Sequence, residues 1–488
     1  MSSAEQRTIA IVGGGFGGIG AAAMLRRAGY DAVTVFERGE RIGGVWHANT
    51  YPGAACDIPS HLYDYSFAPN PRWSRRYAPQ AEIQAYLEDI ARRHAVDVRT
   101  GTDVTGARWE GGRWHLDTSA GPHEADVLIA ACGQLTLPFI PPLRGLDGFE
   151  GPIFHTARWR HDVDLAGKRV AVVGSGCSAI QVVPAIQPEV AQVDVYQRSP
   201  GWTIPKLDFP YRERTLRLFE RFPFLLRLDR AAIMAIQEIG AAAMTRHRRL
   251  LPAIRAAGRS QINRAIKDPE LRRKVTPRDE VGCKRIMLTD DWYPTLTRPN
   301  VELVTERIRE ITSGGVLAED GVERPADVLV LATGFKTHGF VAPMEIAGEG
   351  GRTLAEAWGD VPRAYLGVTV PEFPNLFLLY GPNTNGGTGS VIFTIEAAMR
   401  HVLAALGALE RADARAIEVR REAADAFDRE LRAALAGTVW HSGCTNWYVD
   451  ANGNDPSQWP WSWSAYRRRT AGLDVADYEL AGERQRQH

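Results

Sequence analysis

The sequence predicts an α/β fold with two related strand-turn-helix units and a helical insert. A strand, a glycine turn and a helix occur twice, at residues 8–28 and 168–184. Two apolar segments that each end in glycine, residues 125–133 and 326–334, resemble each other as buried parallel strands of a repeated unit would. Residues 210–279 differ from both units in composition, with arginine and leucine at helical spacing and few strand-forming residues.

Length and charge set the broad class of the protein. With 488 residues, the chain exceeds what one hydrophobic core usually supports, so two or three domains are expected. Lys plus Arg and Asp plus Glu number 58 each, so no global field favours nucleic acid, an anionic membrane or a polyanionic substrate. Any binding of charge must be local. The N-terminal residues lack the features of a signal peptide, and no apolar run reaches the roughly 18 to 20 residues of a membrane helix. We therefore expect a cytoplasmic enzyme with no transmembrane segment.

The cysteines predict neither a metal site nor a redox pair. They are odd in number and scattered, with no Cys-x-x-Cys pair: Cys56, Cys132, Cys177, Cys283 and Cys444. Such a set argues for a reducing compartment, against a zinc site and against dithiol redox chemistry.

The first unit carries the pattern G-x-G-x-x-G at Gly13, Gly15 and Gly18. These glycines allow a tight turn and the close approach of a pyrophosphate to the N-terminus of the following helix. Glu37 ends the second strand, 19 residues past Gly18, where a carboxylate accepts hydrogen bonds from a ribose diol. This unit is therefore expected to bind FAD.

The second unit differs from the first at the same offset. Gly174, Gly176 and Ala179 take the three motif positions, and the residue 19 positions past Ala179 is Arg198. A carboxylate suits a free 2′-hydroxyl, whereas an arginine suits a 2′-phosphate, so this unit is expected to bind NADPH in preference to NADH. An ordinary surface cation is the alternative for Arg198. The residues assigned to NADPH are Gly174, Ser175, Gly176, Ser178, Ala179, Gln181, Arg198 and Ser199.

The two units are expected to be Rossmann-like dinucleotide-binding domains joined by a linker rich in proline and glycine, residues 138–152. Because the strand repeat recurs after the insert, the chain is expected to cross between the domains and return. The helical insert is expected to roof a cleft by packing on the second domain; an amphipathic helix on a membrane surface is the alternative. The expected division is a FAD-binding domain of residues 1–148 and 365–488, an NADP-binding domain of residues 149–209 and 280–364, and a helical insert of residues 210–279.

The stretch from Gly43 to Asp57 follows the first nucleotide unit directly. It reads Gly43-Gly44-Val45-Trp46, then Tyr51-Pro52-Gly53, then Asp57. The Tyr-Pro-Gly turn sets the direction of Asp57, and the glycines let the backbone approach a flat ligand. Asp57 is therefore predicted to be an active-site carboxylate, with an ordinary cap or turn aspartate as the alternative.

Two segments near the C-terminus have candidate roles beside these cofactors. A glycine-rich loop, residues 381–390, contains Asn385 and leads into a helix expected from about Val391 to Glu410. Such a loop directs N–H groups at an electron-rich ligand edge, as the pyrimidine end of a reduced flavin requires; a long loop with a serine cap is the alternative. Most tryptophans of the tail are expected to be packing anchors, with one or two lining the substrate entrance or the nicotinamide: Trp440, Trp447, Trp459, Trp461 and Trp463.

A second long motif lies between the linker and the second nucleotide unit. The pattern F-x-G-x-x-x-H-x-x-x-W is satisfied by Phe149, Gly151, His155 and Trp159. Together with the stretch from Gly43 to Asp57, it resembles the signature motifs of the type I Baeyer–Villiger monooxygenases, a class B flavoprotein monooxygenase family. The resemblance covers nearly the whole chain. One departure is Arg160, which follows the motif where the family usually has Pro or Asp.

The resemblance implies roles for single residues. The family's catalytic arginine lies in a Lys-Arg pair before a tyrosine-containing stretch and an Arg-Pro-Asn-Val run, which corresponds here to Lys284-Arg285. It implies that Arg285 is catalytic, that Asp57 orients it, and that His155 couples the domains, where a structural histidine is the alternative. The residues assigned to FAD are Gly13, Gly15, Gly18, Glu37, Gly44, Val45, Trp46, Asp57, Tyr63 and Asn385.

The resemblance also implies a reaction. NADPH reduces FAD, the reduced flavin captures O2 as a C4a-peroxide, and attack on a ketone inserts one oxygen beside the carbonyl to give an ester or lactone. An arginine suits this chemistry because it supplies a fixed positive charge at any working pH. The alternatives are a flavin-containing monooxygenase that oxidises amine nitrogen or sulfide sulfur, and a non-catalytic flavoprotein that senses redox state. The missing cysteine pair disfavours a flavin disulfide reductase.

Overall fold

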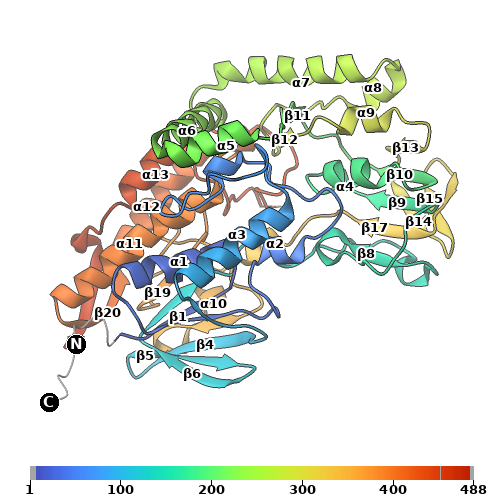
Figure 1. The fold of residues 1–488 in the computed structure, drawn as a ribbon. Coiled ribbons are helices and arrows are strands. Elements are labelled where there is room, and N and C mark those ends of the chain that lie inside the picture. The colour runs from blue at the N-terminus through green and yellow to red at the C-terminus, as the bar shows by residue number, and fades with distance from the viewer. Residues whose placement is uncertain (1–6, 451, 484–488) are drawn as a thin grey trace.

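Two five-stranded parallel sheets organise the chain in the computed structural model, which describes residues 7–450 and 452–483 (Figure 1). In the first sheet, β1 is hydrogen-bonded between β7 and β2, and β19 and β3 lie at the edges. Burial on both faces explains why β1, β7 and β19 are short, continuous apolar runs, whereas the edge strand β3 is polar and exposed. The strands are β1 (Ile9–Val12), β2 (Val33–Phe36), β3 (Asp97–Arg99), β7 (Val127–Ala130) and β19 (Leu376–Leu378).

The second sheet repeats this arrangement, with β9 between β10 and β17. The two apolar repeats of the sequence, β7 and β17, therefore occupy equivalent places, each beside the strand that leads into a glycine turn. This confirms the predicted pair of Rossmann-like units. The strands are β8 (Ile153–His155), β9 (Arg169–Val173), β10 (Gln192–Tyr196), β13 (Val301–Val304) and β17 (Val328–Leu331).

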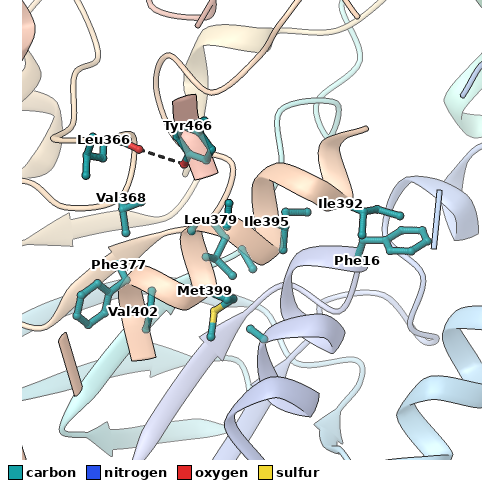
Figure 2. Close-up of a cluster of buried hydrophobic side chains, with 14 of the residues drawn as sticks. Phe16, Leu366, Val368, Phe377, Leu379, Ile392, Ile395, Met399, Val402 and Tyr466 are labelled. Carbon is teal, nitrogen blue, oxygen red and sulfur yellow. Dashed lines mark hydrogen bonds between the residues drawn. The ribbon is translucent and has the colours of Figure 1, made fainter. Parts of the chain in front are cut away.

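Helices cover the first sheet. The alanine-rich α1 (Phe16–Arg27) packs against α11 (Val391–Arg411), and α3 (Gln80–Arg93) packs beside α1. Figure 2 shows the core between α11 and β19, where the Tyr466 hydroxyl donates to the Leu366 carbonyl oxygen at 3.1 Å. By length and composition α11 is apolar enough to cross a membrane, but 67% of its most apolar window is buried inside the protein. It is a core helix of the first unit.

Smaller sheets and helices complete the two units. A meander of β4, β5 and β6 pairs with β18 beside the first sheet, and β14 to β16 form a second meander beside the second sheet. The strands are β4 (Val104–Glu110), β5 (Arg113–Thr118), β6 (Gly121–Ala125), β18 (Glu345–Ala347), β14 (Ile308–Ile311), β15 (Gly315–Ala318), β16 (Glu323–Pro325), β11 (Thr203–Ile204), β12 (Met287–Leu288), β20 (Ala414–Val419) and β21 (Tyr478–Glu483). The helices are α2 (Val45–Ala48), α4 (Ala179–Ile186), α9 (Trp292–Leu296), α10 (Leu354–Trp358), α12 (Arg421–Leu435) and α13 (Trp463–Arg469).

The helical insert forms one edge of the molecule. It consists of α5 (Glu213–Arg221), α6 (Pro223–Thr245), α7 (Leu251–Ala265) and α8 (Pro269–Val275). Within the helical region expected over residues 210–279, α5 ends before Phe222, because Pro223 lacks the N–H needed to continue it and instead begins α6. Figure 1 shows α5 and α6 above the first unit, whereas α7 and α8 extend toward the second. The insert thus touches both units, not the second alone.

Candidate active site

The turn before Asp57 packs directly on the second nucleotide unit. Gly53 has φ +81°, and a Cβ there would lie 2.7 Å from the Gln181 carbonyl oxygen of α4, so no larger residue fits. Gln181 also accepts from the Tyr51 hydroxyl at 2.9 Å and donates to the Ala55 carbonyl oxygen at 2.9 Å. These contacts hold the turn that directs Asp57 between the two units.

Arg285 lies in the segment that follows the helical insert, and its side chain contacts Asp57. Its Nη2 donates to Asp57 Oδ2 at 2.6 Å, and its Nε donates to the same oxygen at 3.2 Å. The segment that carries it begins at Gly282, which has φ +88°, and continues into β12, which pairs with β11. The two residues are 228 positions apart in the chain, and the structure brings them together as an ion pair.

The charges at this pair reinforce each other. Burial alone would raise the pKa of the Asp57 carboxyl, but the Arg285 guanidinium, with a smaller effect from Lys206, holds it below the ordinary value. The Asp57 carboxylate in turn raises the pKa of Arg285 well above its usual range. Both groups are therefore ionised around neutral pH, and the guanidinium is a fixed positive charge.

Groups from three further parts of the chain surround Arg285. Burial raises the pKa of the Cys177 thiol, in the second glycine turn, and the nearby Arg285 acts in the opposite direction. Burial raises the pKa of Tyr380 to about 12, and burial also raises the pKa of Tyr448; Arg285 acts in the opposite direction on both. Both phenols therefore remain neutral near Arg285, which leaves Asp57 as the carboxylate that balances its charge.

The first glycine turn is built as the motif predicts. A Cβ on Gly13 would lie 2.4 Å from the Ala131 carbonyl oxygen, and one on Gly18 would lie 1.8 Å from the Gly13 carbonyl oxygen. Glu37 accepts from the Gly14 N–H at 2.7 Å, so the carboxylate lies over the turn. The N-cap residue Gly15 provides no side-chain cap, which leaves the start of α1 open to an anion.

The stretch from Gly43 joins this turn through its own glycines. Gly43 donates its N–H to the Gly14 carbonyl oxygen at 2.9 Å. Gly44 has φ +55°, and a Cβ there would lie 3.0 Å from the Cα of Gly15. Val45 and Trp46 then begin α2. The motif thus extends the wall of the first nucleotide unit, as expected for residues that approach a bound cofactor.

Hydrogen bonds join aromatic and amide groups of the first unit and of the glycine-rich loop. The Trp46 indole donates to the Tyr63 hydroxyl at 3.0 Å. Asn385, in the glycine-rich loop, accepts from the Tyr380 hydroxyl and donates to Gln134 Oε1 at 2.6 Å. Gln134 directly follows the glycine at the end of the β7 repeat, and its buried amide was not singled out in the sequence analysis.

The second glycine turn presents a more open surface. A Cβ on Gly174 would lie 2.3 Å from the Ala332 carbonyl oxygen, whereas one on Gly176 would meet nothing within 4 Å. Neither Ser178 nor another side chain caps α4, which begins at Ala179 and includes Pro184 within an intact helix. An anion could therefore approach the start of α4 as it could the start of α1.

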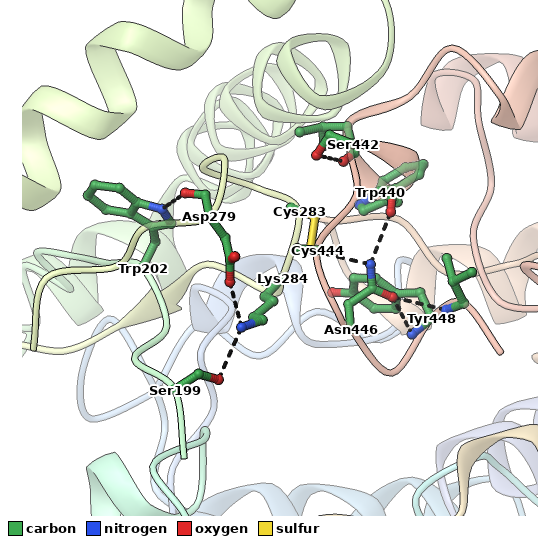
Figure 3. The surroundings of a disulfide bond; sticks show 12 residues. Ser199, Trp202, Asp279, Cys283, Lys284, Trp440, Ser442, Cys444, Asn446 and Tyr448 are labelled. Carbon is green, nitrogen blue, oxygen red and sulfur yellow. Dashed lines mark hydrogen bonds and ion pairs between the residues drawn. A yellow bond between two sulfur atoms is a disulfide. The ribbon is translucent and has the colours of Figure 1, made fainter. Parts of the chain in front are cut away.

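Two cations lie beyond this turn. Arg198 is exposed and has no hydrogen-bond or ion-pair partner among residues 7–450 and 452–483. The next residue, Ser199, accepts from Lys284 Nζ at 3.1 Å, and Lys284 also pairs with Asp279 at 2.6 Å (Figure 3). The two side chains of the Lys-Arg pair therefore have different partners: Lys284 contacts the second nucleotide unit, and Arg285 contacts Asp57. This position of Lys284 was not inferred from the sequence.

The motif from Phe149 to Trp159 forms the edge of the second sheet. A Cβ on Gly151 would lie 2.3 Å from the Asp327 carbonyl oxygen, and Phe149 is buried beside it. His155 ends β8, paired with Leu331 of β17, and burial lowers its pKa, so the imidazole is neutral. Trp159 packs edge-on against Phe154 with ring centroids 5.0 Å apart. The following Arg160 pairs with Asp162 in solvent, so this departure from the family pattern does not alter the motif's packing.

The tryptophans of the tail are mostly anchors, as expected. Trp440, Trp459, Trp461 and Trp463 are buried, and only Trp447 of the five is exposed. Two of the buried indoles, those of Trp440 and Trp463, have an N–H without an acceptor among the described residues. An unpaired buried donor is costly, so each is suited to a partner that brings an acceptor group.

The structure joins two of the scattered cysteines, a pairing that the sequence did not predict. Cys283, immediately before Lys284, forms a disulfide with Cys444 of the tail, and the other three cysteines are free (Figure 3). Their separation of 161 residues leaves no local signature in the sequence. The argument for a reducing compartment from odd, scattered cysteines therefore fails for this pair. The bond fixes the segment of Arg285 to the tail that carries Trp440 and Tyr448.

We expect reduction of this disulfide to lower the melting temperature by several degrees. Closing so long a loop typically stabilises a protein by about 2–4 kcal/mol, chiefly by restricting the unfolded chain. Differential scanning fluorimetry with and without a phosphine reductant measures the shift. Cys444→Ser should melt at the reduced temperature under both conditions, whereas Cys132→Ser, which changes a free cysteine, should keep the wild-type response. Equal melting of reduced and untreated wild-type protein would contradict the prediction.

Comparisons with known proteins identify relatives of the whole chain. Residues 10–220 match the family described as "Pyridine nucleotide-disulphide oxidoreductase". A "Baeyer-Villiger monooxygenase" of Streptomyces coelicolor is 40% identical over 482 residues, covering 98% of this chain and 93% of that protein. The solved "Oxidized steroid monooxygenase bound to NADP" superposes with a TM-score of 0.87 at 32% identity, covering 97% of this chain and 99% of that one. The "OTEMO complex with FAD and NADP" superposes with a TM-score of 0.86 at 25% identity, covering 98% and 100%.

Proposed function

Because this chain belongs to the Baeyer–Villiger monooxygenases, we propose that Arg285 and Asp57 form the charged centre at which its ketone substrate is oxygenated. The enzyme consumes NADPH and O2 and inserts one oxygen atom next to a carbonyl to give an ester or lactone. FAD, when bound, supplies the oxygen activation, and NADPH supplies the hydride. The observation that carries the assignment is the Arg285–Asp57 ion pair. Asp57 precedes the insert in the chain and Arg285 follows it, and the two meet where the two nucleotide units are in contact.

The residues of the first unit fit FAD. The uncapped start of α1 offers N–H groups to a pyrophosphate, and Glu37 lies over the glycine turn where it would accept from a ribose diol. Gly44 brings backbone to within van der Waals contact of that turn. Trp46, Tyr63 and Asn385 would line the flavin, with Tyr63 held by the Trp46 indole and Asn385 by the Tyr380 hydroxyl.

The residues of the second unit fit NADPH. Gly174, Gly176 and the uncapped start of α4 would take the pyrophosphate. Arg198 is free to bind a 2′-phosphate, and Lys284, held against Ser199, would add a second positive charge there. Gln181 has both ends of its amide engaged by the Tyr51-to-Ala55 turn, so we assign it to the junction of the units more than to direct contact with the cofactor.

In the reaction, Arg285 would stabilise negative charge as it develops on the ketone oxygen. Its guanidinium is held by two hydrogen bonds from one side, so it need not reorganise when that charge appears. Asp57 is the positioning residue: it accepts both bonds and stays ionised because of Arg285 and Lys206. Tyr380 and Tyr448 keep the surroundings neutral.

We propose the expected domain division with one change. β19 pairs with β7, which supports assigning residues 365–488 to the FAD-binding domain with residues 1–148. However, β18 pairs with β4 of that same domain, so the chain returns before Glu345 and not at residue 365. His155, at the end of β8, would couple the FAD-binding domain to the NADP-binding domain of residues 149–209 and 280–344.

The site of action would be the cytoplasm, where NADPH is supplied.

A product assay tests this function. NADPH oxidation by the FAD-loaded enzyme is measured with cyclic, aryl and long-chain ketones and with thioethers and amines as substrates. The products are identified by mass spectrometry. We expect an ester or lactone one oxygen atom heavier than its ketone. If only sulfoxides or N-oxides formed, the alternative of a nitrogen- or sulfur-oxidising flavin monooxygenase would replace the proposal, and the roles of Asp57 and Arg285 would be withdrawn.

A further inference from the structure

The helical insert carries an exposed apolar surface that the reaction does not use. Among the described residues, nine of the fifteen large apolar side chains that are exposed lie between residues 207 and 250. On α6, Phe224, Leu228, Ile236 and Ile239 are 50%, 61%, 61% and 60% exposed. Their spacing of three, four and eight residues places them on one stripe of the helix. A stripe of this kind on a protein surface marks an interaction site.

The stripe cannot turn inward, because the opposite face and the flanks of α6 are fixed to the body of the protein. The Gln237 side chain accepts from the Gly389 N–H at 2.9 Å, and Glu238 accepts from the Ser464 N–H at 2.6 Å. Nearer the start of the helix, Asp229 pairs with His61 at 2.7 Å, and Arg230 pairs with the buried Asp64. The apolar stripe is therefore the outward face of a helix already docked.

The charge around the stripe is strongly one-sided, although the whole chain is neutral. Residues 212–250 contain nine arginines and four acidic residues. All four acids are engaged: Glu213 and Glu220 with Arg72, Asp229 with His61, and Glu238 with backbone N–H groups at the start of α13. The following arginines are exposed and form no ion pair with a described residue: Arg214, Arg221, Arg227, Arg246, Arg248 and Arg249.

We propose that this surface, formed by α5 and α6 with residues 246–250, docks the enzyme on an anionic lipid bilayer. Apolar side chains on an outward helix face would enter the interface, and the arginines at both ends of α6 would pair with lipid phosphates. Figure 1 shows α5 and α6 at an outer edge of the fold, where a flat surface can reach them. A second copy of the chain is a poorer occupant, because symmetric pairing would bring the two sets of arginines together.

Vesicle flotation with the FAD-loaded full chain tests the proposal. The wild type should float with vesicles of phosphatidylcholine and phosphatidylglycerol at moderate salt, and not with phosphatidylcholine alone. The triple variants Leu228→Ser/Ile236→Ser/Ile239→Ser and Arg246→Gln/Arg248→Gln/Arg249→Gln should each bind at least ten-fold more weakly, while retaining FAD. Val322→Ser/Val475→Ser changes two apolar residues of similar exposure, 49% and 51%, elsewhere on the surface and should bind like wild type.

Three results would overturn the proposal. One is a wild type that stays with the soluble fraction in the presence of anionic vesicles. Another is a triple variant, apolar or arginine, that floats as well as wild type. The third is a wild-type dimer in sedimentation velocity that becomes a monomer in the apolar variant, without flotation of either, since this would make the stripe an interface between two copies of the chain.

Discussion

Arg285→Ala should abolish ketone oxygenation and leave FAD bound and reducible. The guanidinium is the fixed cation of the site. Removing one preorganised hydrogen-bond donor that stabilises developing negative charge typically lowers the rate about 10²- to 10³-fold. The proposed FAD cradle consists of the glycine turns around Gly15 and Gly44 and does not include this side chain, so we expect the flavin to bind without it. Flavin absorbance, anaerobic bleaching by NADPH and ester yield by mass spectrometry separate the three properties.

A matched control for this variant is Arg298→Ala, which removes an exposed arginine 13 positions further along the same segment. It should keep wild-type ester yield. Asp57→Asn leaves the arginine but weakens the two hydrogen bonds that aim it, so its loss should be smaller than that of Arg285→Ala. Ester formation by Arg285→Ala within ten-fold of wild type would remove Arg285 from the catalytic role.

The nucleotide units could be predicted from sequence because their signals are local. Each glycine motif lies within a few residues of its strand and helix, and the positions of Gly13, Gly18 and Gly174 follow from the tight turn itself. The repeat of β7 and β17 was also visible, since both are short, fully buried apolar runs. Spacing alone thus predicts the architecture and the kind of ligand, a dinucleotide, for each unit.

The assembly of the site was beyond local pattern. Arg285 and Asp57 meet across 228 residues, so their pairing came from resemblance to a family and not from spacing. The disulfide of Cys283 and Cys444 spans 161 residues and has no sequence signature. Lys206, which adds to the charge at Asp57, looked like any surface lysine. Contacts of this kind depend on how the two units and the insert pack, which no single segment encodes.

The insert illustrates a different limit. A helix with apolar residues all round has no face that pattern alone assigns to the core. In α6 the inner face includes Leu226, Ile233 and Met244, and the outer stripe is equally apolar. Helical character over residues 210–279 was therefore predictable, whereas the exposure of one face required the contacts of Gln237 and Glu238 with neighbouring segments.

Arg198→Ala should weaken the use of NADPH far more than that of NADH. The two cofactors differ only in the 2′-phosphate, so an arginine that pairs with it contributes to one and not to the other. Charge-assisted hydrogen bonds are worth about 1.5–3 kcal/mol, which predicts a drop of roughly 10- to 100-fold in kcat/KM for NADPH. Steady-state rates with both cofactors, at a saturating ketone, give the ratio directly.

Lys284 decides how large this effect is. Its ammonium is held next to Ser199 and paired with Asp279, so one cation would remain near the phosphate after Arg198 is removed. Lys284→Ala should therefore lower the NADPH preference as well, and the double variant should accept both cofactors nearly equally. Arg212→Ala, an exposed arginine of the insert, should leave the ratio unchanged. Equal losses with NADPH and NADH in Arg198→Ala would mean that the side chain contacts a part common to both, and the 2′-phosphate would have to be bound elsewhere.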